Sequence, residues 1–244
     1  MAKLMSNSAY RLHQILKKGM EHGNNEKTKD VWKSILGIDD DFNIFSKICA
    51  VQSLIDETVR TFEIHDPENY KEYLAWLPQI ENAFNKQDLS GNWQTFRSAV
   101  SSSTLSMLFT SASALNGFTG YTKVSNEDLS LLREKTNKLM DEIKLSDLDN
   151  DVQLFILNHL YSILKALDDY QIKGPDYLIE KIERATGSTT LKLHKEKIPK
   201  ENLKSFMNYL INTATIVGLC NGLSDFAGLE SPTELLKLAF DQET

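Results

Sequence analysis

The chain is poor in the residues that tight turns, sheets and cross-linked small folds require. Its 244 residues include only 5 prolines and 11 glycines, which disfavours a β-sandwich or a barrel with many tight turns. The two cysteines, Cys49 and Cys220, lie too far apart in the sequence to suggest a disulfide framework or a zinc knuckle. Both lie in apolar helical patterns, and we therefore expect reduced and buried thiols.

Common catalytic, metal-binding and nucleotide-binding motifs are absent as well. The sequence has no His-Glu-x-x-His, no Cys-x-x-Cys and no Gly-x-Ser-x-Gly pattern. Residues 39–41 are acidic but lack the glycine and the closing glutamate of a calcium loop. Residues 117–123 lack the Gly-Lys-Ser/Thr order of a phosphate loop. We therefore expect no cofactor and no metal ion.

Basic residues are fewer than acidic ones, with 27 Lys and Arg against 34 Asp and Glu. The formal net charge is −7 and the isoelectric point is near 5.3, which argues against broad binding to the phosphate backbone of nucleic acids. The first residues contain no continuous apolar segment followed by a small-residue cleavage site. We therefore predict that there is no signal peptide and that the protein is cytoplasmic.

What the chain does have is helical periodicity along most of its length. Ile44, Ile48 and Val51, for example, begin one apolar stripe, whereas no sustained alternation demands a sheet. Pro78 lies inside one such pattern and should kink that helix or split it in two. Helices are expected over residues 8–22, 28–36, 41–64, 68–86, 93–115, 125–143, 151–174, 176–185, 203–226 and 232–240.

Residues 151–174 are the most apolar of these expected helices. Val152, Ile156 and Leu160 recur at helical spacing, and Leu154 and Tyr161 widen the apolar band to most of the circumference. A helix that is apolar on nearly all sides is typical of the centre of a helical domain. We therefore predict an all-α protein, a multi-helix bundle around this buried central helix, with a C-terminal helical hairpin.

The clearest change in composition falls at residues 188–202. Residues 190–194 alternate like a brief strand, and a lysine-rich stretch with Pro199 follows. We predict a helical bundle over residues 1–187, a basic linker or flap over 188–202, and a hairpin over 203–244 that packs on the bundle or on a partner. Lysines ahead of an apolar segment can also mark membrane association, although asparagines interrupt this segment.

Residues 101–106 are unusually rich in serine and threonine for the middle of an expected helix. Small hydroxyl side chains can bond to the preceding turn, and they let another backbone approach closely. Two interpretations remain open at this point. The serines either mark a tight crossing of two helices or line a polar cleft for a small molecule.

One pair of residues has the spacing of a catalytic motif. Arg60 and His65 are separated by four residues, and this resembles the short motif of HEPN-domain ribonucleases, helical bundles that usually work as dimers. The resemblance implies that Arg60 stabilises phosphate charge and that His65 transfers a proton near neutral pH. Thr61 differs from the Asn, Asp or His that often follows the arginine in that family. Asp56 could instead form an ordinary surface pair with Arg60.

A second resemblance covers roughly residues 10–185. It is to a group of bacterial, cytoplasmic, all-helical proteins with no assigned activity, and it implies a protein of that kind without implying a reaction. Among the residues that carry it, the three tryptophans are expected to be core anchors. The resemblance rests on residues 27–32, 36–38 and 73–77, on Trp93 with Phe96, and on residues 157–160 and 170–174.

No coherent active site emerges from these patterns, and we therefore expect a non-catalytic interaction protein. It would work by self-association and by binding another protein, for example in a bacterial phage-defence or toxin–antitoxin system. The first alternative is a HEPN-like ribonuclease that uses Arg60 and His65, for which a nucleic acid would be the partner. The second is an effector that associates with membranes through the C-terminal hairpin.

Overall fold

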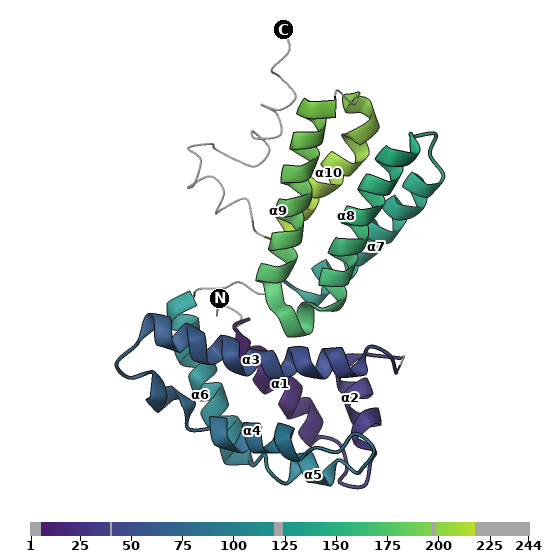
Figure 1. Ribbon diagram of the computed structural model, residues 1–244. Helices are drawn as coiled ribbons and strands as arrows, with labels where there is room; N and C mark the ends of the chain where they lie inside the picture. Colours follow the sequence, from purple (N-terminus) through teal and green to yellow (C-terminus); the bar gives the residue numbers. More distant parts are fainter. Residues whose placement is uncertain (1–5, 40, 120–123, 197–198, 218–244) are drawn as a thin grey trace. The chain divides into compact units, whose positions relative to one another are not determined.

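All regular structure that the computed structural model describes is helical, so the predicted all-α fold is confirmed (Figure 1). The structure describes residues 6–39, 41–119, 124–196 and 199–217. The helices are α1 (Ser8–Met20), α2 (Thr28–Leu36), α3 (Ile44–His65), the 3₁₀ helix η1 (Tyr70–Leu74), α4 (Leu77–Lys86), α5 (Gln94–Arg97), α6 (Ser102–Thr119), α7 (Asn126–Lys144), α8 (Asn150–Asp168), α9 (Tyr170–Glu196) and α10 (Lys200–Ile216).

The helices form two compact units with separate apolar cores. Unit 1 comprises Met1–Lys123 with Gln171–Gly174, and unit 2 comprises Val124–Tyr170 with Pro175–Thr244. The sequence analysis placed the main boundary at residue 187 instead. The chain divides earlier because one apolar cluster is built almost entirely before Val124 and the other almost entirely after it.

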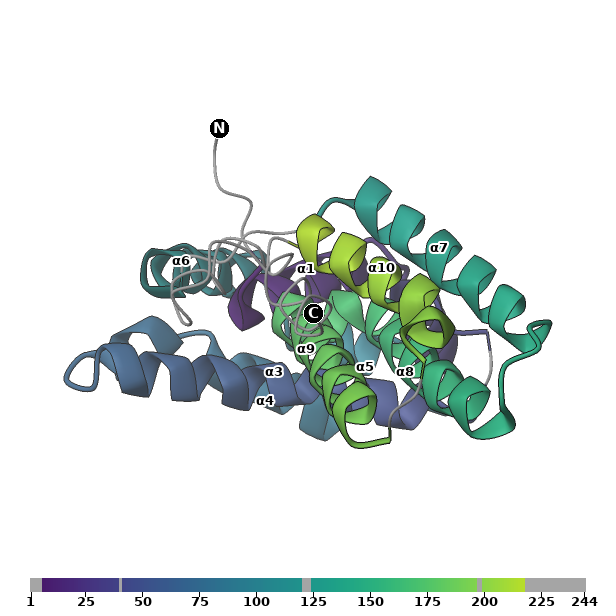
Figure 2. The same cartoon turned by 90° about the horizontal axis from the view of Figure 1, so that it is seen from above.

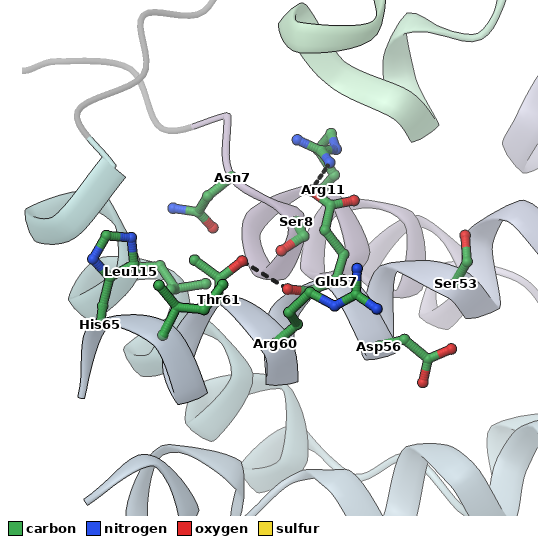
Figure 3. Close-up of a pocket in the computed structure, with 11 residues that line it drawn as sticks. Asn7, Ser8, Arg11, Ser53, Asp56, Glu57, Arg60, Thr61, His65 and Leu115 are labelled. Atoms are coloured by element: carbon green, nitrogen blue, oxygen red, sulfur yellow. Dashed lines mark hydrogen bonds and ion pairs between the residues drawn. The ribbon is translucent and has the colours of Figure 1, made fainter. Parts of the chain in front are cut away.

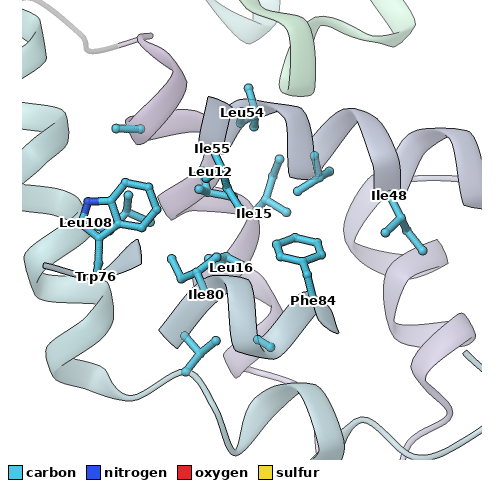
Figure 4. Close-up of a cluster of buried hydrophobic side chains, with 14 of the residues drawn as sticks. Leu12, Ile15, Leu16, Ile48, Leu54, Ile55, Trp76, Ile80, Phe84 and Leu108 are labelled. Atoms are coloured by element: carbon cyan, nitrogen blue, oxygen red, sulfur yellow. The ribbon is translucent and has the colours of Figure 1, made fainter. Parts of the chain in front are cut away.

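In unit 1 the other helices pack around α1. This helix contacts α2, α3 and α6, and its apolar side chains Leu12, Ile15 and Leu16 are buried in the core that also holds Ile80 and Phe84 of α4 (Figure 4). Fully burying a side chain of this size stabilises the fold by about 1.5–3 kcal/mol. The position of α1 therefore largely determines the shape of the unit.

The three tryptophans are buried core residues, as predicted. The rings of Trp32 and Trp93 meet edge to face at 5.4 Å between centroids, an arrangement that aromatic quadrupoles favour. The indole N–H of Trp93 donates to the carbonyl of Gly19 at 2.8 Å. A Cβ atom at Gly19 would lie 2.9 Å from Cζ2 of Trp93, so this close approach requires glycine.

Two of the expected helices in unit 1 are divided. Residues 68–86 form η1 and then α4, with Pro78 in the first turn of α4, so the predicted split is confirmed. Residues 93–115 were expected to form one helix, but they form α5 and most of α6. The hydroxyl of Ser101 accepts the N–H of Thr104 at 3.1 Å and so starts α6, which is why the earlier helix ends before it.

Unit 2 is a bundle of α7, α8, α10 and the part of α9 that follows Pro175 (Figure 2). The hydroxyl of Ser125 caps α7 by accepting the N–H of Asp128 at 3.0 Å. α7 then packs along α8 and against α10. A buried hydrogen bond of 2.7 Å joins the hydroxyls of Thr136 and Tyr209 across the second of these contacts, and burial raises the pKa of the Tyr209 phenol.

Contrary to the prediction, α8 is not buried on all sides. It buries one side, which carries Ile156 and Leu160, whereas Leu154 is 59 % exposed and Tyr161 is 51 % exposed. The reason is architectural, because a helix in a small bundle turns only one face to the common core. Leu154 and Tyr161, which widen the apolar band in the sequence, therefore lie exposed on unit 2.

The expected basic linker over residues 188–202 is helical as far as Glu196. The hydroxyls of Thr186, Thr189 and Thr190 donate to carbonyls four residues earlier, which satisfies these groups within a helix and explains why the strand-like alternation is misleading. α10 covers the start of the expected hairpin. Residues 218–244, including Cys220, lie outside the described residues.

Two further observations bear on the sequence analysis. Cys49 is exposed, so the expectation of a buried thiol at this position is wrong. It lies on the outer side of α3, where the apolar stripe does not reach. Within the described ranges, the structure contains no helix whose length and hydrophobicity would allow it to cross a bilayer.

The one-sided burial of α8 predicts a contrast between two leucines of this helix. Leu160→Ala should lower the free energy of unfolding by about 2–5 kcal/mol, because it opens a cavity in the core of unit 2. Leu154→Ala should change it by no more than about 0.5 kcal/mol. Urea unfolding followed by circular dichroism measures both values. Equal losses would show that α8 is buried on both sides.

Candidate functional site

A cavity of about 510 Å³ in unit 1 contains both residues of the predicted catalytic pair, Arg60 and His65 (Figure 3). It lies where the start of α1 meets the second half of α3, with Leu115 of α6 at its edge. Its lining is polar and charged for the most part. The other residues that line it are Asn7, Ser8, Arg11, Ser53, Asp56, Glu57, Thr61 and Ile64.

The polar groups at the start of α1 are used to hold helices together. Asn7 caps α1 by accepting the N–H of Tyr10, and its amide donates to the carbonyl of Ala112 in α6 at 2.9 Å. The hydroxyl of Ser8 accepts a hydrogen bond from Thr58 of α3 at 2.8 Å. Asn7 and Ser8 are thus bonded to groups of α1, α3 and α6, so they form a scaffold for the cavity more than a set of donors for a ligand.

Arg11 is the most heavily engaged side chain of the cavity. It is a buried arginine whose Nε donates to the carbonyl of Ile172 at 2.8 Å and whose Nη2 pairs with Oε1 of Glu57 at 2.8 Å. Its Nη1 donates to the carbonyl of Ser6. One guanidinium thus connects the chain start, α3 and the segment at residues 171–174, which lie far apart in the sequence.

Gly174 makes room for this arginine. Its φ of 71° and ψ of −171° fall in a region that side chains avoid, and the helical backbone of α9 is interrupted there. A Cβ atom at this position would collide with Nη1 and Cζ of Arg11. Glycine is therefore required both by the backbone conformation and by the arginine that packs against it.

Arg60 and His65 line the same cavity but point to different ends of it. The guanidinium of Arg60 extends toward Asp56, and the His65 ring lies at the opposite end, near Asn7 and Leu115 (Figure 3). The ring also stacks on Phe118, with centroids 5.4 Å apart and planes inclined by 4°. α3 ends at His65, as the following Asp66-Pro67 suggests. The two side chains therefore do not converge on one position that a substrate could occupy.

The charges in the cavity nearly balance. Two arginines, Arg11 and Arg60, face two carboxylates, Asp56 and Glu57, and Glu57 is already paired with Arg11. A site that holds a phosphate normally presents an excess of cationic and N–H donors. The arrangement can form hydrogen bonds to a zwitterionic group, but it does not concentrate positive charge.

The serine-rich segment lines a second, shallower hollow in unit 1. This hollow of about 400 Å³ includes Ser101 and Ser102 together with Asn24 and Arg97. Ser101, Ser102 and Ser103 are exposed, which rules out a tight helix crossing at these three residues. The interpretation as a polar lining is the one that this geometry favours. Arg97 is held at the rim by the side chain of Asn24, at 2.7 Å.

His13, which is buried, and His159, which is half-buried, are held in apolar surroundings. His13 packs against Phe109, and its pKa is lowered by burial and then by Lys17. His159 lies between Phe155 and Phe206, and burial lowers its pKa, with Arg184 contributing less. Among the residues that the structure describes, no three His, Cys, Asp or Glu side chains are grouped so that they could hold a metal ion.

Sequence reasoning missed Arg11 and Glu57, the pair that organises the cavity. A signal for Arg11 existed, because it lies four residues before Ile15 of the apolar stripe and so shares the apolar side of the helix. An arginine on that side needs a partner. No local pattern identifies Glu57, which lies 46 residues away.

Comparison of the chain with protein-family models, with curated proteins and with solved structures gives no match. Arguments about function therefore rest on this chain's own residues.

The contacts of Arg11 predict that it stabilises unit 1. Arg11→Met should lower the free energy of unfolding by about 2–4 kcal/mol, because it leaves buried carbonyls without a donor and Glu57 without its cation. Arg60→Met, an exposed control on α3, should change it by no more than about 0.5 kcal/mol. Tryptophan fluorescence during urea unfolding reports on unit 1, which contains all three tryptophans. Equal effects of the two substitutions would contradict this role.

Proposed function

We propose that this protein is a non-catalytic interaction module that binds a helix of another protein molecule through α8. The observation that carries the proposal is the α8 stripe, which we define as Leu154, Leu157, Tyr161 and Leu164. Leu154 and Tyr161 are more than half exposed, whereas Leu157 and Leu164 are partly exposed and also pack against the core of unit 2.

The α8 stripe has the character of a binding surface for a helix. Its four residues follow one another at intervals of three, four and three, so they lie along one side of α8. Scattered exposed apolar residues are ordinary, but a contiguous apolar surface usually marks a site of interaction. An amphipathic partner helix that presents apolar residues at the same spacing would cover it.

The candidate active site supports this proposal by its construction. Most polar side chains that line the cavity around Arg60 already form hydrogen bonds within unit 1, and the opposite charges in its lining balance. The predicted catalytic pair points to opposite ends of the cavity. A bacterial phage-defence or toxin–antitoxin system, the example given in the sequence analysis, would supply partners for a module of this kind.

Photo-crosslinking in the native host tests the proposal. With p-benzoylphenylalanine in place of Tyr161, ultraviolet light should give a protein adduct of one defined mass, because the partner helix lies within reach of the ring. The matched control places the crosslinker at Leu191 on α9, which is 59 % exposed and lies off the α8 stripe. Leu154→Asp should remove the adduct at position 161.

Absence of an adduct at position 161, or equal adducts at both positions, would refute the proposal. An adduct that persists unchanged with Leu154→Asp would also count against it, since a charge in the stripe must disrupt apolar packing.

A second candidate is the HEPN-like ribonuclease, and one observation favours it. Arg60 and His65, chosen from spacing alone, line the same cavity. This candidate predicts RNA cleavage by the purified protein that falls by about 10²–10⁴-fold in both Arg60→Ala and His65→Ala. Glu63→Ala is the control, because Glu63 is an exposed residue of α3 outside the cavity lining. If the unmodified protein does not cleave RNA, this candidate fails.

A further inference from the structure

The α8 stripe has the spacing of a short coiled-coil contact. Intervals of three, four and three residues are those of alternating a and d positions in two successive heptads. The next position in the series is Asp168, whose carboxylate is held by Arg133 at 2.6 Å. The apolar contact therefore spans about three turns of α8 and ends where a paired charge begins.

A row of three exposed residues borders the stripe on one side. Asp151, Asn158 and Lys165 are seven residues apart from one another, so they occupy equivalent positions along the helix. The row begins with a negative charge in the first turn of α8 and ends with a positive charge in the last turn. Asn158 lies midway, and the two charges are about 21 Å apart along the helix axis.

The order of this row is self-complementary when two copies of α8 run in opposite directions. Reversal places Asp151 of each copy opposite Lys165 of the other, which gives two such pairs. It also places Asn158 of one copy opposite Asn158 of the other. A side-chain amide both donates and accepts, so two asparagines can bond to each other. The apolar residues pair about a point one residue further along, at position 159, where Leu154 faces Leu164 and Leu157 faces Tyr161. This closes an isologous interface around a two-fold axis.

We propose that the occupant of the α8 stripe is a second copy of this chain, with the two α8 helices packed antiparallel around an axis near Asn158. This inference rests on the proposed function and names its partner. The charges select this arrangement. In a parallel pair the row of one copy would lie on the opposite side of the interface from the row of the other, so these charges would not meet. The antiparallel pair brings the two rows together with opposite charges facing each other, and it aligns the helix dipoles favourably.

Sedimentation equilibrium of the full chain measures the predicted association. The protein of 27.7 kDa should show a reversible monomer–dimer equilibrium. Leu154→Asp should weaken the dimer by at least about a hundredfold, since it places a charge in an apolar contact twice over. Leu191→Asp, at the equally exposed leucine of α9, should leave the dimer constant unchanged. Circular dichroism confirms that each variant keeps its helices.

A charge exchange tests the antiparallel order. Asp151→Lys and Lys165→Asp should each weaken the dimer by about tenfold, because each replaces two attractive contacts with two repulsive ones. The double variant Asp151→Lys/Lys165→Asp should recover the original dimer constant. These effects should shrink in high salt, where exposed charges are screened. Failure of the double variant to recover would overturn the antiparallel arrangement.

A cysteine at the axis gives an independent readout. In a Cys49→Ser/Cys220→Ser background, Asn158→Cys should form an intermolecular disulfide under mild oxidation, because position 158 faces its own copy. Glu142→Cys, at an exposed position of α7, should not. Equal crosslinking at the two positions would overturn the proposal.

The outcomes separate this inference from the proposed function. A chain that stays monomeric in sedimentation, but gives an adduct with a different protein at position 161, overturns the second copy and leaves the interaction module in place. A monomer without any adduct overturns both. A dimer that Leu154→Asp does not weaken overturns the use of α8.

Discussion

The buried guanidinium of Arg11 is the constraint on which the architecture of unit 1 depends. A charged group in an apolar environment is costly unless its N–H donors are satisfied. Here the donors reach the carbonyls of Ser6 and Ile172 and the carboxylate of Glu57, so three separate parts of the chain must meet at one point. Gly174 then follows as a necessity, because a side chain there would occupy the space of the arginine.

The two sides of α8 differ in what they contribute to unit 2. Its inner side, with Ile156, Leu160 and Ile163, completes the core of unit 2. Its outer side exposes Leu154 and Tyr161, whereas Leu157 and Leu164 of the same stripe still pack against that core. The proposed contact with a partner would bury Leu154 and Tyr161, which the folded unit leaves exposed.

Sequence reasoning succeeded where a local pattern determines the structure. Helical spacing identified most helices, and Pro78 located a split. It failed where two structures share a pattern. A helix apolar all round can be central or can face a partner, and the threonines around residue 189 suit a strand until their hydroxyls bond within a helix. Sequence reasoning could not identify the Arg11–Glu57 pair, because only the folded chain brings residues 46 positions apart into contact.

The return of residues 171–174 to unit 1 has a consequence for how the protein can be divided. Ile172 belongs to the core of unit 1, although the chain before and after this segment belongs to unit 2. A fragment that ends at Lys123 would thus lack both a core residue and an acceptor of the Arg11 side chain. The two units have separate interiors, yet the first is not an autonomous module in the genetic sense, because part of its interior is encoded within the second.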